Sequence, residues 1–261
     1  MLLDEKNAVI YGAGGSVGRA VALAFAREGA RVFLAGRTRG SLQPVAQEIA
    51  EAGGTTEVAE VDALDEAAVD EHAEAVARAG GGIDVSFNTI GHGDVHGMPL
   101  LEMPYEQFTR PIELATRSLF LTTRAAARHM AARGSGVIMT ITATTPYQRL
   151  PEIGGTGVRF DAMESQCRTW AAELGPLGVR VLWLRTTGLP EALADIPLFP
   201  AYGTEGPMSK EELIAWQERK TMLKRLTTLE ELGRAATFAA SDLASAMTGC
   251  AVNITCGAVP G

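Results

Sequence analysis

The sequence predicts a single-domain α/β protein built on a doubly wound parallel sheet of about seven strands flanked by helices. Short apolar or β-branched runs alternate along the chain with segments of helical length. Such alternation is typical of parallel strands joined by right-handed helical crossovers. A chain of 261 residues with 46% hydrophobic content can also bury one substantial core.

Each predicted element follows from its own pattern. The first helical segment places Val17, Val21, Ala24 and Phe25 on one apolar stripe that can cover a sheet. Apolar and β-branched composition predicts strands at 7–11, 31–35, 56–61, 83–88, 136–142, 179–184 and 251–255.

The alternation of strands and helices is interrupted after the sixth predicted strand, over residues 189–217. Prolines and glycines are frequent there, at Pro190, Pro197, Pro200, Gly203, Gly206 and Pro207. Ligands of such sheets bind beyond the carboxyl ends of the strands, so one interpretation is a substrate lid. Its apolar side chains then suggest an apolar ligand: Leu189, Leu193, Ile196, Leu198, Phe199 and Met208. A disordered surface insertion is the alternative.

Composition excludes several classes of partner. The formal charge of −8 and the absence of a basic run argue against a surface for nucleic acid or anionic membranes. No segment approaches the roughly 18 apolar residues that cross a bilayer. Three cysteines, Cys167, Cys250 and Cys256, are too few and too irregularly spaced for a disulfide framework or a zinc site. We expect a soluble cytoplasmic protein.

A glycine-rich turn joins the first strand to the first helix. It reads Gly12-Ala13-Gly14-Gly15-Ser16-Val17-Gly18. Glycines allow a tight turn, a close approach of the backbone to a pyrophosphate, and placement of that group on the positive end of the helix. The position between a strand and a patterned helix predicts a dinucleotide site. A turn needed only for helix packing is the alternative.

Two arginines, Arg37 and Arg39, follow the second strand, where an NAD-preferring protein would usually have an acidic group. The planar donors of a guanidinium match a phosphate, so NADP(H) is expected in preference to NAD(H). Two solvated arginines at a helix start are the alternative.

With these residues, the chain resembles the short-chain dehydrogenase/reductase family, whose members have a Rossmann fold. Further motifs that match the family are Asn88-Thr89-Ile90-Gly91, Gly178-Val179-Arg180-Val181 and Met247-Thr248-Gly249. The resemblance implies that Asp62 and Ala63 contact the adenine, that Asn88 and Gly91 line the cofactor channel, and that Thr187-Gly188-Leu189 approaches the nicotinamide. It also implies a homotetramer or homodimer assembled on helices at about 104–133 and 154–175.

The chain departs from the family pattern most strongly in the catalytic set. The family's serine falls on Ala143, its tyrosine on Thr156, its lysine on Phe160 and its asparagine on Ala115. No lysine occurs between Lys6 and Lys210. Loss of a positioned proton donor typically lowers a rate by ~10²–10⁴. Carbonyl reduction by the family's tyrosine–lysine route is therefore disfavoured.

Two other residues are candidate proton donors near the expected site. Tyr147 is the phenol nearest to it, and His92 titrates near neutrality when unperturbed. Structural roles for both are the alternatives. The spacing His92-Gly-Asp94-Val-His96 could align three metal ligands, but the sequence offers no evident fourth ligand, so no metal is expected.

Three functions remain open on the sequence. The first is an atypical NADP(H)-dependent oxidoreductase with a small apolar substrate. The second is an isomerase, lyase or cyclase on the same scaffold. The third is a catalytically silent NADP-binding subunit. Fold alone does not separate them, because function belongs to the site.

Overall fold

The computed structural model describes residues 1–194 and 199–260 and contains one parallel sheet in the order β3-β2-β1-β4-β5-β6-β7. All neighbouring strands pair in parallel. The strands are β1 (Asn7–Tyr11), β2 (Arg31–Gly36), β3 (Thr55–Glu60), β4 (Val85–Asn88), β5 (Gly136–Ala143), β6 (Val179–Thr186) and β7 (Cys250–Asn253). The predicted fold class and its seven strands are confirmed, with ends that shift by one or two residues.

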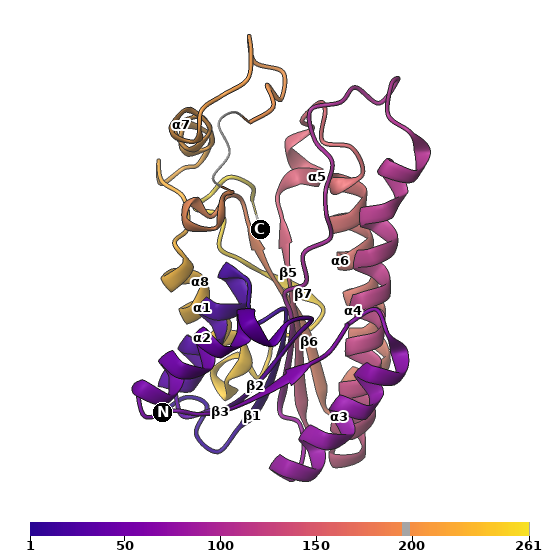
Figure 1. Cartoon of the computed structure of the whole chain (residues 1–261), viewed down its shortest axis with the longest axis vertical. Coiled ribbons are helices and arrows are strands. Elements are labelled where there is room, and N and C mark those ends of the chain that lie inside the picture. Colours follow the sequence, from indigo (N-terminus) through magenta and orange to yellow (C-terminus); the bar gives the residue numbers. More distant parts are fainter. Residues whose placement is uncertain (195–198, 261) are drawn as a thin grey trace.

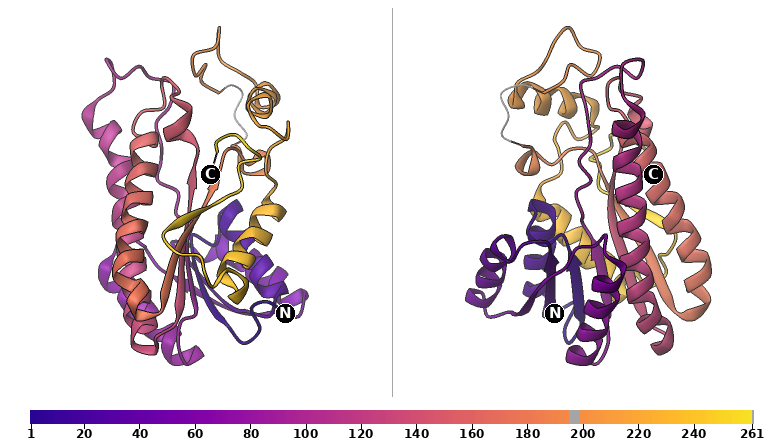
Figure 2. Two further views of the ribbon diagram at one scale, coloured as in Figure 1. Left: turned by 180° about the vertical axis from the view of Figure 1, so that it is seen from behind. Right: turned by 45° about the vertical axis from the view of Figure 1, so that its right-hand side comes forward.

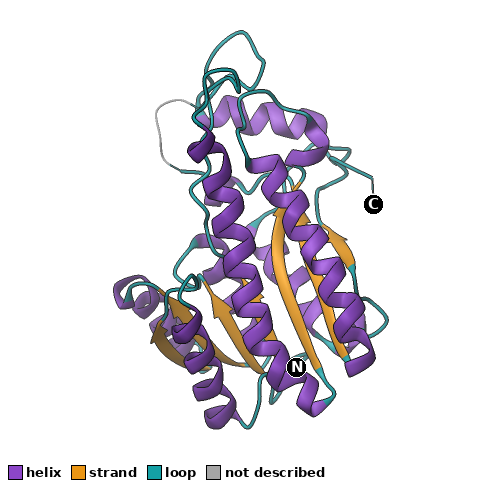
Figure 3. Cartoon of the chain, turned by 90° about the vertical axis from the view of Figure 1, so that its right-hand side faces the viewer, coloured by secondary structure: helices purple, strands orange, loops and turns teal. Residues whose placement is uncertain are grey.

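Helices cover both faces of the sheet (Figures 1 and 2). One layer contains α1 (Ser16–Arg27), α2 (Arg39–Glu51) and α8 (Leu229–Ala240). The other contains α3 (Glu66–Gly80), α4 (Tyr105–Arg133) and α6 (Thr156–Leu174), and Figure 3 shows α4 and α6 in front of the strands. No described helix is long and apolar enough to span a membrane.

Alternation along the strands separates two cores. On β1, Ala8 and Ile10 pack toward the α1 side, whereas Val9 and Tyr11 pack toward the α4 side. Successive side chains of a strand point to opposite faces, and a parallel sheet covered on both sides buries both sets. The central strands are therefore rich in apolar residues on both faces, which is why their sequence signal is strong.

Residues 189–194 and 199–217 lie beyond the carboxyl ends of the strands together with the short α5 (Thr145–Gln148), as Figure 1 shows. Phe199 and Met208 pair across an antiparallel bridge, and α7 (Lys210–Lys220) follows. Ser209 caps α7 through a capping box with Glu212, as expected of a helix start. Ile196, Pro197 and Leu198 lie outside the described residues.

The apolar side chains of this segment pack largely on one another. Phe199, Met208 and Leu213 are buried in a small cluster with Leu193, Tyr202 and Trp216 at its edge. Phe199 and Met208, two of the apolar residues that suggested a ligand face, are thus buried within the segment itself.

Candidate functional site

The glycine turn is shaped by contacts that leave no room for side chains. Gly12 has φ +82°, and its N–H donates to the carbonyl of Ala35 at 2.9 Å. A Cβ on Gly18 would lie 2.3 Å from the carbonyl oxygen of Gly12, and one on Gly14 would lie 2.5 Å from the Oγ of Ser41. These positions require glycine because the turn, α1 and α2 approach one another so closely.

Gly15 is different, because a Cβ there would meet only the Gly12 oxygen at 3.5 Å. It is the N-cap of α1 and has no side chain to occupy the helix N–H groups, and the first turn of α1 holds no acidic residue. Free N–H groups at a helix start attract an anion. The local structure therefore suits a pyrophosphate.

A pocket of about 520 Å³ opens in front of this helix terminus. Its walls come from the carboxyl ends of β1 to β4 and include seven of the cofactor residues expected from the sequence: Gly12, Gly14, Gly15, Arg37, Asp62, Ala63 and Gly91. The other lining residues are Gly36, Thr38, Ser41, Val61, Leu64, Thr89, Ile90 and Leu114. The residues present fit a dinucleotide.

The remaining expected cofactor residues do not line that pocket. Ser16, Val17 and Gly18 form the first turn of α1. Asn88 is buried, donates to Thr122 at 3.0 Å and accepts from the N–H of Ile90 at 3.1 Å, so it shapes the turn after β4. Gly188 packs against Gln217, and Leu189 is buried in the core.

Arg37 and Arg39 lie between the end of β2 and the first residue of α2, and both are exposed. Neither guanidinium forms an ion pair within the described ranges. The backbone N–H of Arg39 donates to the Glu60 carboxylate at 2.8 Å. Arg37 lines the pocket itself, so its charge is available to a phosphate there.

The four positions that the family resemblance assigns to catalysis hold side chains that do not ionise near neutral pH. Ala115 is fully buried in α4, and Ala143 ends β5. Thr156 begins α6, and Phe160 lies one turn further along the same helix face.

Thr156 is joined to two residues that are distant in sequence. Its Oγ1 lies 2.8 Å from Nε2 of His96, and Nδ1 of His96 lies 3.0 Å from the hydroxyl of Tyr202. The His96 and Tyr202 rings meet edge to face with centroids 5.8 Å apart. The loop after β4, the start of α6 and the segment before α7 therefore converge at this point.

His92 and Asp94 form a second network, around Arg159. The guanidinium pairs with Asp94 at 2.6 Å and donates to Nδ1 of His92 at 3.0 Å, while Nε2 of His92 lies 3.3 Å from Ser118 Oγ. Burial, and secondarily the charge of Arg159, lowers the pKa of His92 to about 3. His92 is therefore held neutral with both ring nitrogens engaged, an environment that favours a structural role.

Tyr147 belongs to a third network, centred on Glu164. The carboxylate is 1% exposed and forms a two-point pair with Arg185 at 2.7 and 3.0 Å. It also accepts from Thr142 at 2.9 Å and from the hydroxyl of Tyr147 at 3.3 Å. Burial and the Glu164 charge raise the pKa of Tyr147, so this phenol is stabilised in its protonated form.

The two arginines and the glutamate that organise these networks, Arg159, Arg185 and Glu164, are not among the site residues predicted from the sequence. Glu164 lies four residues after Phe160 on the same helix face, and that spacing could have revealed it. Arg185 interrupts the apolar run of β6, which is an unusual place for a charge. Arg159 offers no such local signal.

The loop residues His92, Asp94 and His96 do not converge. His92 and Asp94 face Arg159, whereas His96 faces Thr156 and Tyr202. Within residues 1–194 and 199–260, no three side chains of metal-ligating type are grouped as a metal site.

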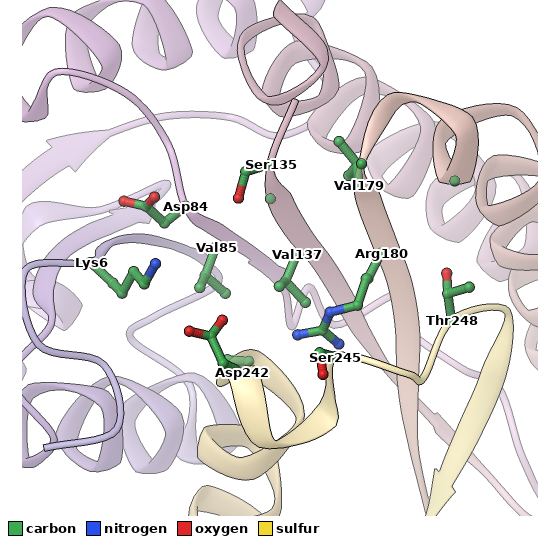
Figure 4. A pocket seen from close by; sticks show the side chains of 14 residues that line it. Lys6, Asp84, Val85, Ser135, Val137, Val179, Arg180, Asp242, Ser245 and Thr248 are labelled. Atoms are coloured by element: carbon green, nitrogen blue, oxygen red, sulfur yellow. The ribbon is translucent and has the colours of Figure 1, made fainter. Parts of the chain in front are cut away.

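A separate pocket of about 370 Å³ lies at the amino ends of β4, β5 and β6 (Figure 4). Two of its charged side chains, Asp84 and Arg180, are engaged in the fold. Asp84 accepts from Arg133 at 2.5 Å, and Arg180 donates to the carbonyls of Ala239 and Ser241 at 3.0 and 3.1 Å. This crevice lies at the opposite end of the sheet from the glycine turn.

The fold and the glycine pocket define a Rossmann-type dinucleotide-binding protein. The sequence model of the family described as enoyl-(acyl carrier protein) reductase matches residues 12–258. The chain belongs to the short-chain dehydrogenase/reductase family of oxidoreductases.

Several characterised proteins are similar over nearly the whole chain. L-rhamnose 1-dehydrogenase (NAD(P)(+)) of Azotobacter vinelandii is 29% identical, with 95% of this chain and 94% of that protein covered. Enoyl-[acyl-carrier-protein] reductase [NADH] 1 of Rhizobium meliloti is 27% identical, with 95% and 88% covered. A structure of 7 alpha-hydroxysteroid dehydrogenase complexed with NADH and 7-oxo glycochenodeoxycholic acid superposes with a TM-score of 0.85 at 27% identity and covers 99% of this chain and 96% of that one.

Proposed function

We propose that the protein is an NADP(H)-dependent oxidoreductase that acts on a small apolar substrate without the family's tyrosine–lysine pair. The observation that carries the proposal is the pocket in front of α1, with its uncapped helix start and an exposed Arg37 in its wall. Bound NADPH would supply the hydride. Gly12, Gly14 and Gly15 would hold the pyrophosphate, Asp62 the adenine, and Arg37 with Arg39 the 2′-phosphate.

Reduction of a carbon–carbon double bond conjugated to a carbonyl suits this site better than reduction of a simple ketone. Hydride addition to carbon then spreads charge onto an enolate, whose protonation can follow in a separate step. The enoyl reductase description of the matching family and the Rhizobium meliloti relative support this class of substrate.

The test begins with binding and proceeds to turnover. NADPH fluorescence should change on mixing with the protein, and the bound cofactor should be oxidised by at least one member of a panel of apolar enones, aldehydes and ketones. Absence of NADPH binding would contradict the proposal. Binding without oxidation by any panel member would instead favour the second candidate, a silent or non-redox NADP-binding protein, which the replacement of all four family catalytic residues supports.

We also propose that the chain forms a homodimer or homotetramer through α4 and α6. Phe120 and Val158 expose 41% and 48% of their surface on these helices, and Phe120 contacts Trp170. Burial of such apolar surface between copies would be favourable. Light scattering coupled to size-exclusion chromatography should give a multiple of the 27.5 kDa chain mass, which Phe120→Glu should reduce.

A further inference from the structure

We propose that Tyr202, His96 and Thr156 form a proton relay that ends at the substrate oxygen, with Thr156 as the group that touches substrate. This inference rests on the proposed function and adds the route of the proton. The three residues come from three separate segments at the carboxyl ends of the strands. Thr156 occupies the position of the family's tyrosine, so the relay ends where a proton is needed.

The geometry of the relay is continuous. His96 Nε2 and Thr156 Oγ1 are 2.8 Å apart, and His96 Nδ1 and the Tyr202 hydroxyl are 3.0 Å apart. Both distances are those of good hydrogen bonds. Among the described residues, neither hydroxyl has a second hydrogen-bond partner. Thr156 is only 4% exposed, so a hydroxyl hydrogen that it does not give to His96 needs another acceptor, which a substrate oxygen or a water can supply.

The hydrogen bonds have one arrangement that leaves such a hydrogen free. The Tyr202 hydroxyl donates to Nδ1 of His96, the Nε2–H of His96 donates to Thr156, and the Thr156 hydroxyl points its own hydrogen to substrate. Burial raises the pKa of Tyr202 and lowers that of His96, with Asp94 opposing and Arg159 reinforcing the shift of His96. The phenol therefore remains a donor and the imidazole remains neutral.

The relay compensates for the weak acidity of threonine, because Thr156 receives a proton as it gives one up. When hydride adds to the substrate, negative charge develops on the carbonyl or enolate oxygen. That oxygen takes the hydroxyl proton of Thr156, and Thr156 takes the Nε2 proton of His96. Nδ1 of His96 then takes the hydroxyl proton of Tyr202, and Tyr202 regains a proton from solvent. One substrate, one hydride and one solvent proton give the reduced product, and no free threonine alkoxide forms.

Tyr202 also couples the relay to the segment beyond the strands. Its ring stacks on Trp216 of α7, with centroids 6.4 Å apart, and its backbone has φ +47°. A non-glycine residue in this region is uncommon and is held by its surroundings. The packing of this segment against the loop after β4 is thus what places the phenol on His96.

A matched pair of variants tests the relay by turnover. Thr156→Val removes the hydroxyl at nearly constant shape, whereas Thr156→Ser retains it. With the most reactive enone or ketone of the panel, we expect Thr156→Val to lower kcat by about 10²-fold or more and Thr156→Ser to retain most of the activity. Unchanged NADPH binding in both variants shows that the pocket is intact. Equal kcat for wild type and Thr156→Val would overturn the relay.

The pH profile separates a relay from a structural role. A protonated His96 is a stronger acid and gives its Nε2 proton to Thr156 without needing the proton of Tyr202, so wild-type kcat should rise as the pH drops through the lowered pKa of His96. Thr156→Val should lose this dependence. An identical acid limb in both proteins would overturn the relay.

Nuclear magnetic resonance on the cofactor-free protein provides a readout that does not depend on activity. The chain has four histidines, so their ring nitrogens can be assigned by single His→Gln substitutions. We expect His96 to be neutral at pH 7 with its hydrogen on Nε2. A charged ring or a hydrogen on Nδ1 would overturn the relay even if NADPH binds. Failure of NADPH to bind would overturn the proposed function, a result independent of the tautomer.

Discussion

The buried ion pair between Glu164 and Arg185 is expected to contribute strongly to the stability of the protein, and this contribution can be measured. Both residues are almost fully buried, with 1% and 8% of their surface exposed. Four hydrogen bonds end on the Glu164 carboxylate: two from Arg185, one from Thr142 and one from Tyr147. Glu164→Gln keeps the shape of the side chain and removes only its charge and one acceptor oxygen.

The expected effect is large because the guanidinium of Arg185 remains. Removal of one partner leaves an uncompensated charge in a buried site, which destabilises a protein by about 3–5 kcal/mol. The total free energy of unfolding of a typical domain is about 5–15 kcal/mol. Glu164→Gln should therefore remove a substantial fraction of the stability.

Urea unfolding followed by circular dichroism, at fixed protein concentration, measures this effect. The exposed pair Glu74–Arg78 supplies a control, because Glu74→Gln should change stability by less than about 1 kcal/mol. The double variant Glu164→Gln/Arg185→Met should be more stable than Glu164→Gln alone, since no buried charge remains. The reasoning is refuted if Glu164→Gln destabilises no more than Glu74→Gln does.

Three further predictions concern the cofactor pocket and the buried histidine. Arg37→Asp should weaken NADPH relative to NADH in fluorescence titrations, and an unchanged ratio would show that Arg37 does not contact the 2′-phosphate. Gly15→Ala should fold normally but bind NADPH more weakly, whereas Gly18→Ala should also lower the melting temperature, because only its Cβ meets backbone at 2.3 Å. The pKa of His92 is lowered to about 3, so the unfolded chain binds its proton first and stability should fall by up to about 1.4 kcal/mol per pH unit below pH 6.5. His92→Gln should reduce this slope in urea unfolding at pH 7 and pH 4, and an equal slope would contradict the assigned burial.

The strands and the glycine turn could be predicted because their signals are local. A buried parallel strand is apolar along its whole length, and a tight turn before a helix requires glycine at fixed spacing. The apolar pattern predicts a strand only as far as residue 184, because the charged Arg185 follows. The strand continues to Thr186, since the charge of Arg185 is compensated by Glu164, which lies 21 residues earlier in the sequence.

The three side-chain networks were harder to predict, because their members are far apart in the sequence. His96 lies 60 residues from Thr156 and 106 from Tyr202, and nothing in the neighbourhood of any one of them indicates the other two. Tyr147 and His92 were prominent as single residues by type and position. Their pairing with Glu164 and Arg159 depends on how α6 packs against the sheet and on the loop after β4, and no local pattern indicates that packing.

Calorimetric titration of the purified protein with NADPH tests most directly whether the dinucleotide pocket in front of α1 binds its proposed cofactor. We expect saturable binding of one NADPH per chain, tighter than that of NADH and weakened by Gly15→Ala. A titration of well-folded protein that shows no heat of binding for either nucleotide would contradict the account.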